Sequence, residues 1–339
     1  MISFKNDYSE FAHENILKRM LDDHNQYVGY GLDDISNHAK KLIKEHISKD
    51  VDIHFLVGGT QTNKTIIDHI LRPYQAVIAC DGGHINVHET GAIEATGHKV
   101  LIAKSQNGKI TTDGIKEVFY SHPDEHMVMP KMVYISNSTE IGTIYTKAEL
   151  ESISLLCKRL GLYLFLDGAR LAVALTASSN DLTIDDLANF CDVFYIGGTK
   201  NGALLGEAVI ISNDKIKDNF RYSIKRNGGL LAKGFVAGVQ FDELFKNDLY
   251  FRLGLHANEM ALKLKEGLLA LGFKLAFDSN TNQQFVIVNQ GVLDYISKKY
   301  LYEVWDQKGN DITVRLVTSW ATKEKDVLEF LKDLKDYLE

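Results

Sequence analysis

The sequence predicts an α/β fold in which helices cover both faces of a mostly parallel sheet of seven strands, with a smaller α/β domain at the C-terminal end. Up to about residue 215, short apolar runs alternate with segments of helical periodicity, which is typical of parallel sheets between two layers of helices. Long helical segments follow, and strand and helix patterns resume near residue 283. We expect a large domain over residues 1–250 and a small domain over residues 251–339.

Helical periodicity opens the chain, where Ile16, Leu17, Met20 and Leu21 form one apolar stripe. Helices are expected within residues 14–26, 33–47, 61–71, 111–122, 146–161 and 184–191, with a long, interrupted helical segment at 233–272. The seven strands are expected within residues 52–60, 75–83, 98–104, 132–137, 162–170, 192–199 and 207–213. The tail predicts strands within 283–290 and 313–320, and helices within 291–300 and 324–339.

Composition excludes several classes of protein. The net charge of −7 and the pI near 6.0 argue against a general nucleic-acid or anionic-membrane binder, because both need a basic face. Three scattered cysteines suggest buried free thiols rather than disulfides or a metal site. No secretory signal or membrane-spanning run is found. We expect a soluble cytoplasmic protein.

Ligands bind at the carboxyl ends of parallel strands, so the residues that follow such strands are candidates for a binding site. Each residue at these positions also has a structural explanation. The segment "GGTQTN" can be a helix cap or a phosphate cradle, and without GxGxxG or a P-loop it suits a monophosphate. Structural roles are also available to the other residues: Asp167 could cap a helix, with Arg170 as its surface partner. His84 could be a structural histidine, and Lys200 a solvated loop lysine. The strand-end residues are Gly58, Gly59, Thr60, His84, Ser138, Thr139, Glu140, Asp167, Arg170 and Lys200.

The set as a whole matches the needs of one cofactor, pyridoxal phosphate. This cofactor requires a lysine for a Schiff base, an acid for its ring nitrogen, a ring-stacking partner and a phosphate site. Asp167 and Lys200 follow successive strands with one helix between them, which places them on neighbouring strands. The sequence therefore indicates a pyridoxal-phosphate enzyme.

At these residues the chain resembles the threonine aldolase and β-eliminating lyase family of fold-type I pyridoxal-phosphate enzymes, most closely the low-specificity L-threonine aldolases. The resemblance spans nearly the whole chain, and "DGAR" followed by "TKNG" is its most specific part. The matching segments are "NDYSEFAH" (6–13), "GYGLDD" (29–34), "GGTQTN" (58–63), "GHINVHETGAIEATGHKV" (83–100), "YISNSTEIGTIY" (134–145), "FLDGARL" (165–171), "GGTKNGALLGEA" (197–208) and "TVRLVTSWAT" (313–322).

The resemblance implies roles for the residues that bind the cofactor pyridoxal 5′-phosphate. Lys200 would form the Schiff base, Asp167 would pair with the ring nitrogen, and His84 would stack on the ring. Gly59, Thr60 and Gln61 would hold the phosphate. The resemblance implies no metal site.

The resemblance also implies substrate-binding residues and a homodimer or homotetramer with active sites at the interface. Arg170 and Arg315 are candidates for the substrate carboxylate or the cofactor O3′ region. Arg315 is preferred as the carboxylate clamp, because bidentate geometry favours arginine. Asn6 in the N-terminal segment 1–35 would also bind substrate. Tyr30 and Lys233 would reach a neighbouring subunit's site, Lys233 towards its phosphate.

The implied reaction is cleavage of a β-hydroxy-α-amino acid, L-threonine or L-allo-threonine, to glycine and acetaldehyde. Candidate bases are His84, His88 and Glu140, since a base near neutral pKa suits this step. Two alternatives remain: a β-eliminating lyase or aminotransferase reaction on the same scaffold, and a non-catalytic homologue. The chain departs from the family pattern at Phe11, where a glycine is usual, at Glu14, and around residues 227–235. We expect Phe11 to narrow the entrance or to pack between subunits.

Overall fold

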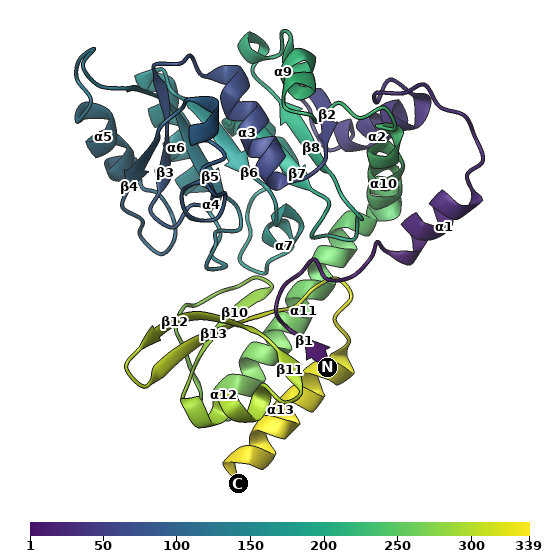
Figure 1. The fold of residues 1–339 in the computed structure, drawn as a ribbon, viewed down its shortest axis with the longest axis vertical. Helices are drawn as coiled ribbons and strands as arrows, with labels where there is room; N and C mark the ends of the chain where they lie inside the picture. Colours follow the sequence, from purple (N-terminus) through teal and green to yellow (C-terminus); the bar gives the residue numbers. More distant parts are fainter.

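The computed structural model describes residues 1–339, and a seven-stranded sheet forms the centre of its larger part (Figure 1). The strands are β2 (Asp52–Leu56), β3 (Gln75–Cys80), β4 (Val100–Ala103), β5 (Met129–Ser136), β6 (Tyr163–Asp167), β7 (Val193–Gly197) and β8 (Glu207–Ile211). Their order is β2-β8-β7-β6-β5-β3-β4, and only β8 runs antiparallel to its neighbours. The predicted mostly parallel sheet of seven strands is confirmed.

Side chains alternate between the two faces of this sheet. In β3, Ala76 and Ile78 belong to one hydrophobic cluster, while Val77 and Ala79 belong to another. The second cluster includes residues of α3, α4 and α9. The first includes residues of α1, α2, α5, α6, α7, α8 and α10. The helices are α1 (Glu14–Asp22), α2 (Asp34–Lys44), α3 (Gly59–Ile70), α4 (His84–Val87), α5 (Thr112–Tyr120), α6 (Lys147–Leu160), α7 (Leu171–Leu175), α8 (Ile184–Phe190), α9 (Phe220–Arg226) and α10 (Phe235–Phe245).

The long helical segment predicted after residue 233 is broken after α10. Asn247 and Asp248 have φ of 53° and 56°, in the left-handed region that cannot continue a right-handed helix. The next helix, α11 (Leu249–Ala270), runs from the large part into the small part (Figure 1). Along its length, Gly254 lies against Ala172 of α7. The same helix therefore contributes to both parts of the molecule.

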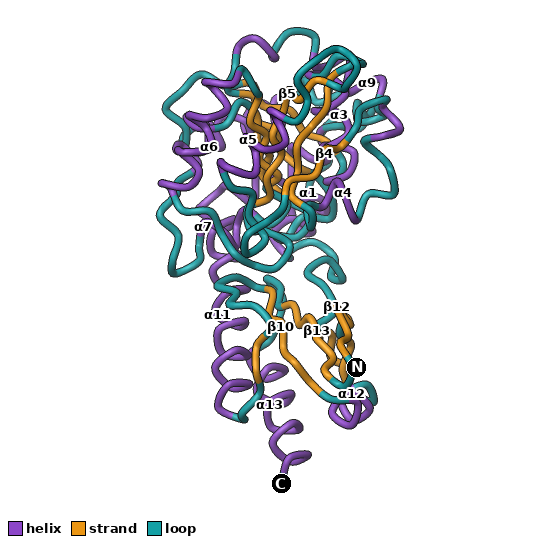
Figure 2. Tube along the Cα trace, turned by 90° about the vertical axis from the view of Figure 1, so that its left-hand side faces the viewer, coloured by secondary structure: helices purple, strands orange, loops and turns teal.

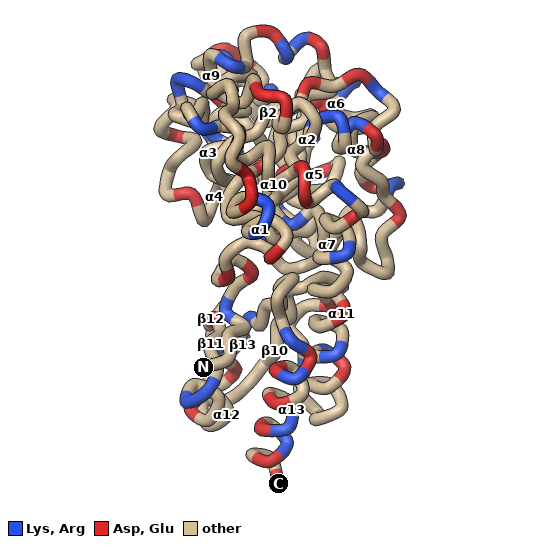
Figure 3. Tube along the Cα trace, turned by 90° about the vertical axis from the view of Figure 1, so that its right-hand side faces the viewer, with Lys and Arg blue, Asp and Glu red and all other residues tan.

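The smaller part is built on a four-stranded antiparallel sheet of order β12-β13-β10-β9. Its elements are β9 (Lys274–Leu275), β10 (Gln283–Val288), α12 (Gln290–Ile296), β12 (Glu303–Lys308), β13 (Asp311–Val317) and α13 (Glu324–Leu338). Strands β10 and β13 and both helices were predicted, whereas β9 and β12 were not. Basic and acidic residues intermingle along α13 (Figure 3). No helix combines the length and apolar character that a membrane crossing needs.

The N-terminus lies on the small part, not on the large sheet (Figures 1 and 2). Strand β1 (Ile2–Ser3) pairs in parallel with β11 (Tyr300–Leu301), and Phe4 is buried against Tyr300 and Phe330. Residues 4–13, which we call the N-terminal arm, then cross to the large part, where α1 begins. The arm therefore spans the space between the two parts.

Candidate active site

A cavity of about 320 Å³ opens at the edge of the sheet where β5, β6 and β7 end. Its wall combines the N-terminal arm, the start of α3 and the loops that follow these strands. Of the sequence-predicted residues, those that line it are Gly59, Thr60, His84, Glu140, Asp167, Arg170 and Lys200. Those that lie outside its wall are Asn6, Tyr30, Gln61, His88, Lys233 and Arg315.

Asp167, the last residue of β6, is buried with four hydrogen-bond donors around its carboxylate. Tyr134 Oη (2.6 Å) and Asn63 Nδ2 (3.0 Å) donate to Oδ2, while Tyr195 Oη and a backbone N–H donate to Oδ1. Burial alone would raise the pKa of Asp167, but nearby His84 and these donors lower it below its usual value. The carboxylate is therefore ionised in a buried position.

The two tyrosines around Asp167 were not among the residues predicted from the sequence. Tyr134 aligns with Phe165 in the β5–β6 register, and Phe165 aligns with Val193 in the β6–β7 register. Asp167 and Tyr195 each stand two residues further on, so all three polar side chains emerge on one face. The period-two pattern of "MVYIS", "YLFLD" and "VFYIG" was the signal that could have identified them.

Lys200 follows β7 in a loop that Glu207, the first residue of β8, holds in place. Glu207 accepts hydrogen bonds from Thr199 Oγ1 at 2.9 Å and from the Gly198 backbone N–H at 3.1 Å. Burial raises the pKa of Glu207 to about 8. Burial and the neighbouring Arg170 lower the pKa of Lys200. A lowered pKa increases the fraction of neutral amine, which is the nucleophilic form.

The N-terminus of α3 faces the same cavity. Gly58 precedes this helix in an extended conformation and gives it no side-chain cap, so the N–H groups of the first turn are available to an anion. A Cβ at Gly59 would stand 3.3 Å from Tyr195 Oη, which explains the small residue there. The Gln61 side chain is engaged elsewhere, because it bonds the Val57 N–H and the Asn227 carbonyl. The backbone N–H groups of this turn and the exposed Thr60 side chain, which lines the cavity, are the groups that could bind phosphate.

His84 begins α4 and is fixed by two acids. Its Nδ1 lies 2.8 Å from Glu89 Oε1, which also accepts a 2.7 Å hydrogen bond from Asn63. The His84 backbone N–H donates to Glu140 Oε1 at 2.9 Å. Burial raises the pKa of Glu140. His88 is exposed, with its ring centroid 5.5 Å from that of His84.

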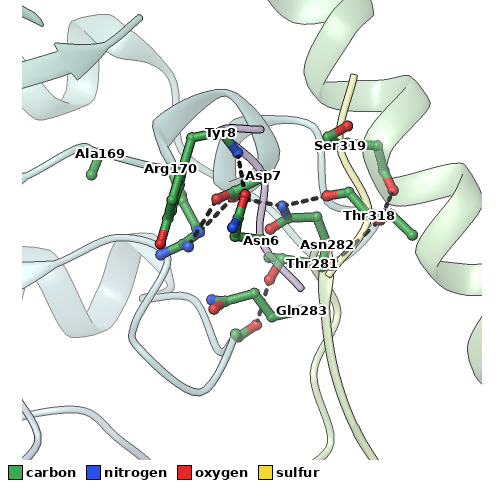
Figure 4. A network of polar contacts seen from close by, with 12 residues as sticks. Asn6, Asp7, Tyr8, Ala169, Arg170, Thr281, Asn282, Gln283, Thr318 and Ser319 are labelled. Atoms are coloured by element: carbon green, nitrogen blue, oxygen red, sulfur yellow. Dashed lines mark hydrogen bonds and ion pairs between the residues drawn. The ribbon is translucent and has the colours of Figure 1, made fainter. Parts of the chain in front are cut away.

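The N-terminal arm supplies an ion pair to the cavity wall (Figure 4). Asp7 accepts hydrogen bonds from Arg170 Nε (2.7 Å) and Nη2 (3.0 Å), and from Asn282 Nδ2 of the small part (2.9 Å). Burial alone would raise the pKa of Asp7, but the charge of Arg170 lowers it. Asn6 turns the arm by accepting the Tyr8 backbone N–H. Asp7 was not predicted as a site residue.

Arg315 lies on β13 beside the cavity and has partners of its own. Its Nη2 donates to Glu303, its Nη1 donates to Gln283 Oε1 at 3.3 Å, and its guanidinium lies 5.2 Å from the Trp305 ring centroid. The Trp305 ring lies 6.4 Å from that of His88, which belongs to the large part. Arg315 therefore stands where the small part meets the site.

Tyr30, Lys233 and Phe11 are exposed on this single chain and lie outside the cavity wall. Phe11 is 79% exposed. Nothing within the chain therefore brings these three side chains to its own site.

The residues of the cavity fit pyridoxal phosphate. The cavity contains an amine of lowered pKa, a buried carboxylate of lowered pKa and a helix N-terminus with available N–H groups. The fourth group that the cofactor needs, a ring-stacking partner, is available in His84 of the wall. Two further polar atoms in the wall, Ser138 Oγ and Asn63 Oδ1, are buried without any partner in the protein. Such atoms are expected where a ligand completes a site.

The fold and the site define an α/β enzyme centred on one lysine and one acid. The chain belongs to the beta-eliminating lyase family, whose sequence model matches residues 12–290, and it is a lyase of that family. The low specificity L-threonine aldolase of Pseudomonas sp. is 31% identical over 92% of this chain and 90% of the relative. The corresponding enzyme of Pseudomonas aeruginosa is 29% identical over 90% of this chain and 89% of its own.

Solved structures agree with this assignment. A threonine aldolase of Leishmania major is 48% identical and superposes with a TM-score of 0.99 over the full length of both chains. An aspartate aminotransferase of Thermus thermophilus is 15% identical with a TM-score of 0.71, over 99% of this chain and 91% of its own. The second likeness concerns the fold alone, and it confirms the predicted fold-type I architecture.

Proposed function

We propose that the chain is an aldolase that cleaves L-threonine or L-allo-threonine to glycine and acetaldehyde with pyridoxal phosphate. The observation that carries the proposal is that Lys200 and the ionised Asp167 meet in one cavity. When bound, the cofactor supplies an electron sink for Cα of the amino acid. The names of the Pseudomonas and Leishmania relatives support the substrate class.

In this proposal His84 takes the proton from the substrate β-hydroxyl. Its Nδ1 is engaged by Glu89, which leaves Nε2 as the ring nitrogen that can accept a proton. Glu140 is less suited, because its Oε1 already accepts two hydrogen bonds, from the His84 backbone and from Ser136 Oγ. His88 stands outside the cavity wall. Glu89 then stabilises the charged ring that the transfer creates.

We also propose a homodimer or homotetramer whose active sites lie at the subunit interface. Tyr30 and Lys233 would enter the neighbouring subunit's site, with Lys233 near its phosphate. Their exposure on the single chain supports this role, since neither has a place in its own cavity. The exposed Phe11 would pack at the same interface.

Product analysis tests the reaction. Purified protein supplied with the cofactor and L-threonine should release acetaldehyde and glycine in equal amounts. A keto acid and ammonia would indicate β-elimination instead, and a keto acid with aminated cofactor would indicate transamination. A protein that stays colourless with added cofactor would contradict the proposal altogether.

A further inference from the structure

Arg170 lines the cavity wall and Arg315 lies beside it, and each already has a carboxylate partner. Asp7 holds Arg170 with both oxygens, and the Asp7 side chain is 1% exposed. Glu303 holds Arg315 through Nη2 alone, and the Glu303 side chain is 40% exposed. Burial lowers the pKa of Arg315 most, and repulsion from Arg170 lowers it further. The two guanidinium groups therefore repel each other and have unequal partners.

The two carboxylates differ in how readily they can leave. Withdrawing Asp7 from Arg170 would strand a charge in a buried site, and it would also break the Asn282 hydrogen bond. Glu303, in contrast, can turn into water and remain solvated, because its side chain is 40% exposed while that of Arg315 is 11% exposed. An incoming carboxylate will therefore replace Glu303 in preference to Asp7.

The guanidinium of Arg315 also has an incomplete set of partners. Its Nε is buried without a hydrogen-bond acceptor, while Gln283 takes Nη1 and Glu303 takes Nη2. A carboxylate that bridges Nε and Nη2 forms the two-point contact that arginine favours. Such a ligand would gain one hydrogen bond that Glu303 does not make.

We propose that Glu303 is an exchangeable counter-ion of Arg315, which the α-carboxylate of the amino-acid substrate displaces when it binds. This inference rests on the proposed function, since it assigns Arg315 to an amino-acid substrate. Glu303 then competes with the substrate and sets its affinity. Glu303 also makes the site selective for ligands with a free carboxylate, because a neutral amide cannot compensate the charge of Arg315 as the Glu303 carboxylate does.

The simpler alternative is that Glu303 only supports the hairpin. It lies directly opposite Arg315 in the β12–β13 register, and cross-strand ion pairs of this kind are common. Under this alternative, removal of the Glu303 charge would loosen Arg315 and weaken substrate binding. Exchange predicts the opposite sign, so one measurement separates the two.

The experiment is a glycine titration of the holoenzyme, followed by its visible absorbance. Glu303→Gln and Glu303→Ala should each lower the Kd for glycine by about two- to fivefold, the scale of an ion pair in which one partner is partly solvated. Glycinamide should show no such gain. The matched control is Glu324→Gln, which removes another exposed acid of the small part, paired with Lys263, and should leave the Kd unchanged.

A second comparison checks that the effect passes through Arg315. In an Arg315→Ala background, Glu303→Gln should no longer change the Kd for glycine. Unchanged or weaker glycine binding in both Glu303 variants would overturn the proposal, and so would an equal gain for glycinamide. Glycine binding requires no bond cleavage, so a failure to release acetaldehyde from threonine would contradict the proposed reaction while leaving this test intact.

Discussion

Tyr134 donates its hydroxyl hydrogen to Oδ2 of Asp167 at 2.6 Å, from the strand next to that of the acid. Together with the nearby His84 and the other donors, this hydrogen bond lowers the pKa of the acid. Asp167→Asn should still bind the cofactor but should lose at least about 10²-fold in kcat, the scale observed when one preorganised electrostatic partner is removed. Steady-state kinetics with L-threonine measure this loss. Tyr134→Phe, which removes one donor and keeps the charge, should lose less, and near-normal turnover of Asp167→Asn would refute the assigned role.

Lys200 is the residue that we expect to bind the cofactor covalently. Lys200→Ala should abolish turnover and the visible absorbance of the lysine-bound cofactor while leaving the circular dichroism spectrum unchanged. Borohydride reduction followed by peptide mapping provides the direct measurement, because it fixes the cofactor on the lysine that holds it. Retention of borohydride-trapped cofactor on another lysine in the variant would contradict the assignment. Lys217→Ala, which removes a lysine from a distant surface ion pair, is the control.

The ion pair between Asp7 and Arg170 should make stability depend on pH. The pKa of Asp7 is lowered in the folded chain. The ionised Asp7 therefore contributes its full stabilisation above the pKa that it has in the unfolded chain, about 4. This contribution is lost as the pH falls through the pKa of the folded state. Asp7→Asn should cost roughly 3–5 kcal/mol at neutral pH, the usual penalty for breaking a buried pair. The free energy of unfolding of this variant should also decrease less than that of the wild type as the pH is lowered. Urea unfolding between pH 3 and about 7 measures both effects.

The matched control for Asp7 is Asp50→Asn. Asp50 also pairs with a cation but is 87% exposed, so this change should alter stability by less than about 1 kcal/mol. Equal effects of the two substitutions would show that the arm contributes no buried ion pair.

Subunit complementation tests the proposed role of Lys233. Lys200→Ala and Lys233→Ala protein should each be inactive or strongly impaired alone. Mixed under conditions of subunit exchange, they should regain activity, because a hybrid dimer contains one site with both lysines intact. If exchange is demonstrated by mass spectrometry and activity stays absent, Lys233 does not complete a neighbour's site.

Arg315 should determine the affinity for the amino acid rather than for the cofactor. Arg315→Lys keeps the charge but loses the planar fork, so glycine binding should weaken by about 1–3 kcal/mol, the range of hydrogen bonds to charged groups. The absorbance of the ligand-free holoenzyme should not change. Spectral titration with glycine measures this, and an unchanged Kd would turn attention to Arg170, whose guanidinium lines the cavity.

The large sheet was readily predicted because burial on both faces leaves continuous apolar runs. Strand β12 escaped prediction for the opposite reason: it lies at a sheet edge, and most of its residues are at least partly exposed. Asp167 and Lys200 were identified from strand ends, which parallel topology brings together. Asp7 was missed because its partner Asn282 lies 275 residues away, and no local pattern encodes such a contact. The roles assigned to all of the site residues, Lys200 and Asp167 included, stay predictions.

The pairing of Ile2 with Tyr300 has a consequence for the order in which the protein is made. A ribosome adds about 5–20 residues per second, so the first strand waits roughly 15–60 s for its partner to be synthesised. During that interval the large sheet can form and Arg170 is available to Asp7, but β1 has no partner and the small part, which supplies Asn282 to Asp7, is missing. The nascent chain therefore completes its catalytic centre only at the end of translation. A ribosome stalled before residue 300 should carry a folded sheet without a closed site.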